Sequence, residues 1–321
     1  MAGLKGFSAG SICLTLKNPH KLCENLGQGG CGGNKCICTS KRSSLQCANV
    51  IRMHTQSKPR LDGSAAAFVD QRLASGRVAF PLEDIINETG LSVLAARNQL
   101  LRLKNRVVRV SPRHRFYLIV SPEHRTMGAP PVTWWLDDYF QWLGEPYYLA
   151  LQSAAGAMGS NPQALQMTQV MTKIPRRPIE IGRVRIQFYV KGTLEQTPTR
   201  PLANAFAPLQ VSSPEATAYD LIRYAPRIGG IGRATETIAP LLTLIRPADL
   251  RRVLKIENDA PAAQRLGFVL EQLRAMELTK VIQRWLPSDL MFVPLVPGSR
   301  DNGNEIRRWK IINNAAEFGR R

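Results

Sequence analysis

Between residues 64 and 105 the apolar positions recur at helical spacing in three short segments. The pattern predicts helices over 64–74, 82–89 and 92–105, which begin at a serine or directly after a proline. Glycines follow the first two segments and are typical of helix ends. In the third segment, apolar residues at i, i+4 and i+7 predict a buried stripe made of Ala96, Leu100 and Leu103.

Short runs of β-branched and aromatic residues flank these helices. They predict strands over 78–80, 107–110 and 116–120, and the last two enclose a basic turn at 111–115. Helix, strand, helix, glycine turn, helix and basic hairpin is the element order of a winged helix-turn-helix. We therefore expect an α+β protein whose first folded domain, residues 53–125, has this architecture.

A winged helix-turn-helix reads DNA with its third helix and its hairpin, and both segments are rich in cationic and amide side chains. Opposite the predicted stripe, Asn98 and Arg102 face outward, where they suit contacts to base edges. The wing tip suits the backbone or the minor groove. The residues predicted to contact DNA are Ser92, Arg97, Asn98, Arg102, Lys104, Arg106, Arg113, His114 and Arg115. Two alternatives stay open: ordinary solvated side chains, and a winged helix that docks a protein.

After a Pro/Gly-rich segment over 121–133, which reads as a linker, the pattern mixes helices and strands. Helices are predicted over 134–143, 147–158 and 214–224, and from Gly229 onward to Trp285. Strands are predicted over 167–172, 179–191, 290–296 and 306–312. Residues 132–321 are therefore expected to form a mixed α/β C-terminal domain.

The net charge points to a polyanionic partner. The chain has 43 basic and 24 acidic residues, a formal charge of +19, and residues 1–130 carry +12 of it. The longest apolar runs are far shorter than the roughly 20 residues that span a bilayer. We expect double-stranded DNA as the partner, no membrane contact and a cytoplasmic location.

Reactive residues give little support for an enzyme. All four histidines precede residue 125, and no Ser-His-Asp, Cys-His or metal-ligand set can be assembled. The glycine-rich run 229–232 lacks the Lys-Ser/Thr of a phosphate loop. We expect no catalytic residue, no cofactor and no metal site.

All six cysteines lie within residues 1–47, without the paired C-x2-C arms that place two thiolates on one zinc ion. We interpret residues 1–52 as a disordered extension outside the core. An abrupt change in composition at Met53 also suggests Met53 as the natural start.

Four strings in the remainder resemble the AbiEi-type antitoxins. They are PYYLALQSAAGAMG (146–159), PQALQ followed by MTQVMT (162–172), RRPIEIGRVRIQFYV (176–190) and SSPEATAYDLIRY (212–224). The last string matches an S-x-E-x-T-x-x-D-L pattern, with Glu215, Thr217 and Asp220 at its polar positions. The resemblance covers roughly residues 65–300 and is carried mostly by core and turn residues.

The resemblance implies an antitoxin of an abortive-infection, type IV toxin–antitoxin system. The N-terminal module would bind inverted repeats in its own promoter and repress the operon, which leaves open a homodimer on DNA. The C-terminal domain would counter a nucleotidyltransferase-type toxin without a stable complex. For Glu215, Thr217 and Asp220 we expect a structural role in capping and packing the helix start. The alternative functions are a nucleic-acid-processing enzyme of a defence system and a winged-helix docking adaptor.

Overall fold

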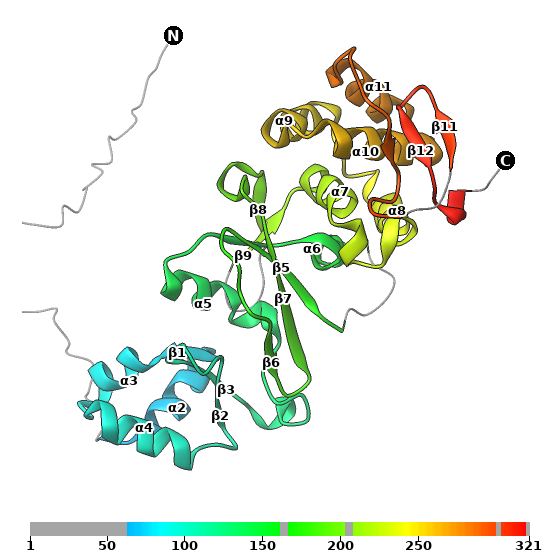
Figure 1. Ribbon diagram of the computed structural model, residues 1–321. Helices are drawn as coiled ribbons and strands as arrows, with labels where there is room; N and C mark the ends of the chain where they lie inside the picture. The colour runs from blue at the N-terminus through cyan, green and yellow to red at the C-terminus, as the bar shows by residue number, and fades with distance from the viewer. Residues whose placement is uncertain (1–62, 161–165, 203–207, 300–302, 319–321) are drawn as a thin grey trace, which may run out of the picture. The chain divides into compact units, whose positions relative to one another are not determined.

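The first described helices begin where the sequence supplies a capping hydroxyl. The computed structural model describes residues 63–160, 166–202, 208–299 and 303–318 (Figure 1). In it, Ser64 Oγ accepts the Ala67 N–H at 3.3 Å. Ser92 Oγ accepts the Ala95 N–H at 3.2 Å in the same way. These bonds satisfy backbone donors that the first turn of a helix leaves free. The expectations for residues 1–52 and their cysteines lie outside the described residues.

Three helices and a three-stranded antiparallel sheet form the N-terminal part of the described chain. Their bounds are α2 (Ala65–Ala74), β1 (Ala79–Pro81), α3 (Leu82–Thr89), α4 (Val93–Arg102), β2 (Val107–Arg109) and β3 (Phe116–Ile119). The sheet order is β1-β3-β2. Gly90, with φ 72°, ends α3 in the left-handed region that favours glycine. The helix α4 ends at Arg102, earlier than the predicted Asn105, and Leu103 is its C-cap.

An apolar cluster and one buried arginine hold these elements together. Phe68 meets Phe80 edge to face with ring centroids 5.0 Å apart, and Phe80 stacks on Tyr117 at 5.7 Å. The Arg72 guanidinium reaches Asp84 and Glu88 of α3 at 2.7 Å each. These two ion pairs offset the cost of burying the Arg72 charge, and they connect α2 to α3.

A mixed sheet forms the centre of the remaining structure. Its strands are β4 (Tyr147–Leu149), β5 (Thr168–Thr172), β6 (Ile179–Ile181), β7 (Val184–Val190), β8 (Thr199–Leu202) and β9 (Leu209–Ser212). Within the described residues the order is β6-β7-β5-β4-β9-β8, with β4 parallel to β9 and β5 parallel to β7. The predicted single strand over 179–191 is thus a hairpin that turns at Gly182, φ 57°.

The prediction of one helix over 147–158 is wrong in its first half. Residues 147–149 are the strand β4, which pairs with β5 on one side and β9 on the other. A short apolar run fits a buried strand and a buried helix equally well, and the neighbouring strands decide between them. The helix α6 begins only at Leu151, whose φ of 53° marks the abrupt change of direction.

Helices cover both faces of this sheet. They are α5 (Leu136–Leu143), α6 (Leu151–Ala157), α7 (Pro214–Arg223), α8 (Gly230–Leu241), α9 (Pro247–Glu257), α10 (Ala260–Gln272) and α11 (Met276–Trp285). Alternate residues of β4 enter different cores: Tyr147 and Leu149 pack in a cluster with α5, whereas Tyr148 packs with α6 to α11. The short 3-10 helices span Pro122–His124, Val132–Trp134, Leu194–Gln196, Ala225–Arg227 and Ala316–Phe318.

The last strands are shorter than the sequence pattern predicts. They are β10 (Val293–Pro294), β11 (Asn304–Ile306) and β12 (Ile311–Asn313), in the order β10-β12-β11. Residues 307–310 form a turn and not strand, with Lys310 at φ 50°. This turn delivers the Trp309 indole onto α10, where a Cβ added at Gly267 would lie 2.1 Å from the ring. Tertiary packing against α10 therefore overrides the apolar strand pattern.

The segment 121–133, predicted as a linker, is packed against the turn between β6 and β7. Arg183 N donates to Met127 O at 2.8 Å, and a Cβ at Gly182 would lie 2.3 Å from that same oxygen. In addition, Phe116 and Leu118 of β3 share an apolar cluster with α5. The boundaries proposed at 125 and 132 stay predictions, but these contacts mean that a shared core joins the two sides. No described helix is long and apolar enough to cross a membrane.

Candidate functional site

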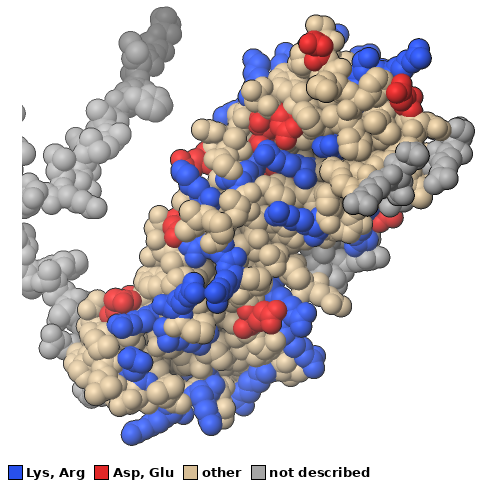
Figure 2. Space-filling view, viewed as in Figure 1, with Lys and Arg blue, Asp and Glu red and all other residues tan. Residues whose placement is uncertain are grey.

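Basic side chains gather on α4 and the hairpin that follows it. Between residues 92 and 119 the chain has seven arginines and lysines and no acidic residue. Arg97, Asn98 and Arg102 are exposed on α4, and Lys104 is exposed directly after it. Figure 2 shows Lys and Arg outnumbering Asp and Glu on the part of this face that carries α4 and the hairpin. Ser92 is exposed as well, but its hydroxyl caps the helix.

Two leucines that the sequence analysis overlooked stand on the same exposed face. Leu94 is 67% exposed and Leu101 is 71% exposed, although both are large and apolar. Leu94 lies two residues before the inward Ala96 and Leu101 one residue after the inward Leu100, so a helical wheel of 92–105 places both outward. That signal was available from the sequence. Together the two leucines add exposed apolar surface to an otherwise basic helix.

A small hollow of about 160 Å³ lies at the edge where α4 meets β2 and β3. Arg97, Lys104 and Arg109 border it, and Leu101 and Tyr117 supply its apolar side. Arg109 Nε donates to His114 O at 2.8 Å, which holds that guanidinium against the hairpin. Three cations around one hollow give this edge of α4 a concentrated positive field.

The predicted DNA contacts in the hairpin divide into two groups. Arg113 and Arg115 are exposed, and Arg106 pairs with Asp70 of α2. The His114 side chain instead faces α5: its Nδ1 shares a 2.6 Å hydrogen bond with the Tyr139 hydroxyl. In this position the ring is an anchor of the hairpin on α5, so His114 is left out of the DNA interface proposed below.

The setting of His114 makes its protonation unfavourable. The Trp142 ring lies 5.9 Å from the imidazole, between ring centroids, and Arg176 contributes positive charge nearby. Burial, and after it the charge of Arg176, lower the pKa of His114, while Glu145 opposes this effect. The imidazole is therefore held neutral in the folded protein near pH 7.

The aspartate of the antitoxin-like string lies in a fully buried charge network. Asp220, at 0% exposure, binds the Lys191 ammonium at 2.6 Å through Oδ1 and accepts the Tyr148 hydroxyl at 2.9 Å through Oδ2. Lys191 Nζ also lies 2.8 Å from Glu257 Oε1. Three elements, β4, α7 and α9, thus meet at the lysine that follows β7. The expectation that Asp220 caps its own helix start is corrected, because it sits at the seventh residue of α7.

Glu257 completes this network from α9. Its Oε2 accepts from Thr193 at 3.0 Å and pairs with Arg223 at 3.2 Å. Two carboxylates therefore balance two cations, which is how a protein offsets the cost of desolvating ions. Burial, together with Asp220, raises the pKa of Tyr148 far above its usual range, so its hydroxyl stays a donor.

The other two residues of the string act at the helix start, as expected. Thr217 Oγ1 donates to Ser213 O at 2.8 Å, within the first turn of α7. The buried Glu215 carboxylate accepts the Arg246 N–H at 2.9 Å and thereby links α7 to the start of α9. Both are structural contacts. The string S-x-E-x-T-x-x-D-L thus fixes α7 against β7, β4 and α9.

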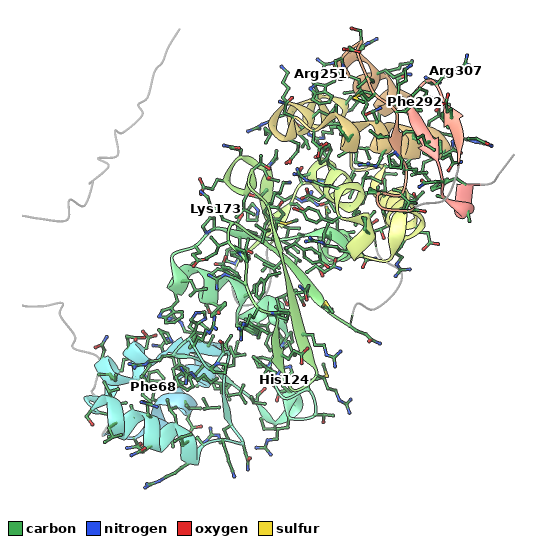
Figure 3. All side chains as sticks on the ribbon, viewed as in Figure 1. Phe68, His124, Lys173, Arg251, Phe292 and Arg307 are labelled. Carbon is green, nitrogen blue, oxygen red and sulfur yellow. The ribbon has the colours of Figure 1, made fainter. Side chains whose placement is uncertain are left out.

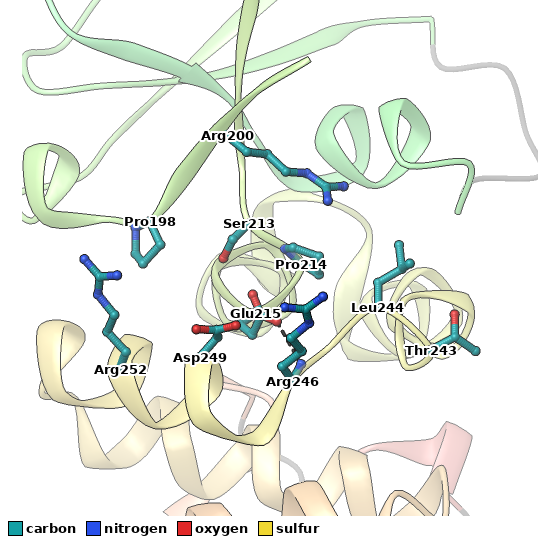
Figure 4. Close-up of a pocket in the computed structure, with 10 residues that line it drawn as sticks. All are labelled: Pro198, Arg200, Ser213, Pro214, Glu215, Thr243, Leu244, Arg246, Asp249 and Arg252. Atoms are coloured by element: carbon teal, nitrogen blue, oxygen red, sulfur yellow. Dashed lines mark hydrogen bonds between the residues drawn. The ribbon is translucent and has the colours of Figure 1, made fainter. Parts of the chain in front are cut away.

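Beside this junction lies a cavity of about 430 Å³ (Figure 4). Arg200, Arg246 and Arg252 line it, together with Ser213 and Glu215 at the start of α7. Sequence reasoning did not find this site, because its residues are spread over 198–252 and its three arginines belong to no motif. Among the described residues, no group of three or more His, Cys, Asp or Glu side chains has an arrangement that holds a metal ion.

Comparison with protein families identifies the domain built around this network. Residues 148–272 match the family described as the AbiEi antitoxin C-terminal domain, from β4 to the end of α10. The chain therefore carries an AbiEi-type antitoxin C-terminal domain. That domain supports the role of an antitoxin in a toxin–antitoxin system, and it confirms the resemblance derived from the sequence.

Solved structures add a likeness of fold. The RV2827C protein from Mycobacterium tuberculosis is 15% identical, with a TM-score of 0.57, over 77% of this chain and 90% of that chain. An antigenic nucleotidyltransferase-like protein from Paracoccidioides brasiliensis is 14% identical over 47% and 90% of the two chains, with a TM-score of 0.34. At that TM-score the second likeness carries no argument, and the first shows the fold alone. No curated protein matches the chain.

Proposed function

We propose that the protein is a DNA-binding repressor that regulates its own operon and acts as the antitoxin of a type IV toxin–antitoxin system. The antitoxin domain supports the second part. The first part rests on the basic surface of α4 and the β2–β3 hairpin. Seven cationic residues and no acidic one over 92–119 is the observation that carries it.

The elements of residues 63–120 support a winged helix-turn-helix. The chain runs α2, β1, α3, α4, β2 and β3, with a glycine turn between α3 and α4. The three strands form an antiparallel sheet with β3 in the centre. In this architecture the third helix enters the major groove and the hairpin lies beside it. The cationic residues here belong to those same two elements.

The exposed residues divide by chemistry into readers and anchors. Asn98 and Arg102 carry donors suited to base edges, and Leu94 and Leu101 offer apolar contacts of the kind that a thymine methyl accepts. Arg97, Lys104, Arg113 and Arg115 are suited to phosphates, which fix the register of a protein on DNA. Arg106 is paired with Asp70, so it would add positive charge to the DNA interface without contacting the DNA directly.

The remaining proposals concern partners. The DNA is the protein's own promoter, with inverted repeats that a homodimer would match, and the site of action is the cytoplasm. The antitoxin domain counters a nucleotidyltransferase-type toxin in cells, without a stable complex. We infer no catalytic activity of the chain itself.

Gel retardation with DNA from upstream of the gene, with and without magnesium, tests the proposal. A repressor shifts this duplex more strongly than a scrambled duplex of equal length, in either condition. Magnesium-dependent cleavage would instead indicate a nucleic-acid-processing enzyme. Equal retention of both duplexes would overturn sequence-specific repression.

The exposed leucines favour one second candidate, a docking adaptor. In that role Leu94 and Leu101 would bind an apolar partner surface in place of base methyls. Replacing both with Gln separates the two functions. Loss of affinity for upstream DNA supports the reader, whereas unchanged DNA affinity with loss of repression or of protection from the toxin supports the adaptor.

A further inference from the structure

The cavity beside the start of α7 gathers three arginines from two separate parts of the chain. Arg200 comes from β8, Arg246 is the residue before α9, and Arg252 lies on the second turn of that helix. Figure 4 shows Arg200 reaching over Pro214 from the strand, while Arg246 rises toward it from the start of α9. The arginines are brought together by the pairing of β8 with β9 and by the contact of α7 with α9.

These guanidinium groups have no anionic partner within the described structure. None of the ion pairs found in the described ranges involves Arg200, Arg246 or Arg252, although ion pairs engage Arg72, Arg106, Arg176, Arg223 and Arg308. One acidic residue of the cavity, Glu215, is buried and already accepts the Arg246 N–H. Asp249 is the other acidic residue that lines it, and it is exposed. The cationic groups thus outnumber the acidic ones.

The charge and shape of the cavity select a class of ligand. Arginine guanidinium groups bind phosphate through paired N–H donors, and three of them around one hollow match more than one phosphoryl group. A cavity of about 430 Å³ falls within the size range of small-molecule sites. A duplex backbone, by contrast, presents single phosphates at regular intervals, which suits the cations spread along α4 and the hairpin.

We propose that this cavity binds a small polyphosphate anion, such as the diphosphate or triphosphate group of a nucleotide. Arg200 and Arg252 would hold it from opposite sides and Arg246 from the start of α9. The helix starts of α7 and α9 add partial positive charge at the floor. Because Glu215 fixes α9 to α7 at this point, an occupied cavity stabilises the junction that also contains Asp220 and Glu257. The site is separate from the proposed DNA interface.

Titration calorimetry of the full-length protein with inorganic pyrophosphate and with tripolyphosphate tests this site. We expect saturable binding with a stoichiometry of one, weakened at least about tenfold in the triple variant Arg200→Gln, Arg246→Gln, Arg252→Gln. Arg251→Gln is the matched control, since Arg251 is an exposed neighbour on α9 that does not line the cavity. It should bind as the wild type does.

A parallel titration with duplex DNA separates the sources of phosphate. Unchanged duplex affinity in the triple variant, with pyrophosphate binding lost, supports the cavity as a small-anion site. The proposal is overturned if pyrophosphate shows no saturable binding, if the triple variant keeps it, or if the variant loses DNA and pyrophosphate binding together. Circular dichroism melting checks that the variant is folded; because the replaced side chains are exposed, its melting temperature without ligand should match the control. Failure of wild-type DNA binding would count against the repressor and leave the pyrophosphate result standing.

Discussion

At the residue scale, the proposed DNA interface divides base reading and phosphate binding between different side chains. Arg102 is exposed on α4, and Lys104 is exposed just past its end at the edge of the hollow beside β2. We expect Arg102→Ala to cost about 1–3 kcal/mol on the operator and to relax preference at one or two base positions. Lys104→Ala should weaken operator and scrambled duplexes alike and lower the slope of log K against log salt by about one.

One titration series over both duplexes at several salt concentrations measures these effects. Arg284→Ala, on α11, is a control that removes the same charge far along the chain. Equal weakening of both duplexes by Arg102→Ala would show that α4 does not read the bases, and the hairpin would then be the better candidate.

The buried network gives a second prediction for single residues. Asp220→Ala removes one of two carboxylates around Lys191 and leaves the buried Tyr148 hydroxyl without its acceptor. We expect a loss of about 3–5 kcal/mol in the free energy of unfolding, measured by urea denaturation. Glu236→Ala, which breaks an exposed pair with Arg233, should cost less than about 1 kcal/mol.

Protection from the toxin distinguishes structure from function at the same position. If the role of Asp220 is structural, protection falls in step with stability. A stable, soluble Asp220→Ala protein that binds DNA normally but no longer protects cells would show that Asp220 acts directly in the antitoxin function.

At the element scale, the contact between the hairpin and α5 depends on pH. The pKa of His114 is lowered in the folded protein by burial and by Arg176, so the unfolded chain takes up the proton first as pH falls. As pH falls below about 6.5, the usual pKa of histidine, this residue therefore lowers the free energy of unfolding. The decrease stops once pH is below the pKa of His114 in the folded protein. Arg109, Arg113 and Glu145 also face this imidazole.

The measurement compares urea denaturation of the wild type and His114→Gln between pH 7.5 and 5. We expect the difference in unfolding free energy between the two proteins to move in favour of the variant as pH falls. His124, whose Nδ1 shares a hydrogen bond with Ser121 Oγ, is present in both proteins, so the difference reports on residue 114. A constant difference over this range would contradict the prediction.

A glycine contact between two turns gives a sharper test of packing. A Cβ at Gly182 would lie 2.3 Å from Met127 O and 2.8 Å from Gly128 Cα, and the residue has φ 57°. Gly182→Ala should therefore cost about 1–3 kcal/mol or more in unfolding free energy. Gly192→Ala is the matched control, because nothing lies within 4 Å of its added Cβ. If both variants melt at the same temperature, segment 121–133 is not held against β6–β7 as described.

At the scale of the whole molecule, the part proposed to bind DNA and the antitoxin domain share an apolar cluster. Phe116 and Leu118 pack in it with Trp135 and Tyr139, and the Phe116 and Tyr139 ring centroids are 5.3 Å apart. A fragment of residues 53–128 exposes this face of β3. We expect it to bind operator DNA when folded, but to unfold at a lower urea concentration than the same region in the full chain.

Amide hydrogen exchange in α4 compares the stability of this region in the fragment with its stability in the full chain. Exchange there should be faster in the fragment than in the full chain. Equal protection would mean that the cluster adds nothing, and the two parts would then be independent modules. A covalently dimerised fragment decides whether lost affinity reflects lost dimerisation.

The sequence by itself determined the features whose signals lie within a few residues. Ser64 and Ser92 cap helices because a hydroxyl three residues before an N–H is a local arrangement, and Gly90 ends α3 for an equally local reason. The strings that resemble the AbiEi-type antitoxins could also be recognised in the sequence. The family match over residues 148–272 confirms them.

Tertiary structure decided what depends on distant partners. Residues 147–149 are a strand because β5 and β9 flank them, and His114 faces inward because it shares a hydrogen bond with the Tyr139 hydroxyl of α5. Lys191 is buried because it meets Asp220, 29 positions further along the chain. The arginine cavity exists because α9 packs on α7. Periodicity and capping describe a residue's near neighbours, whereas burial and concavity arise from segments that only folding brings together.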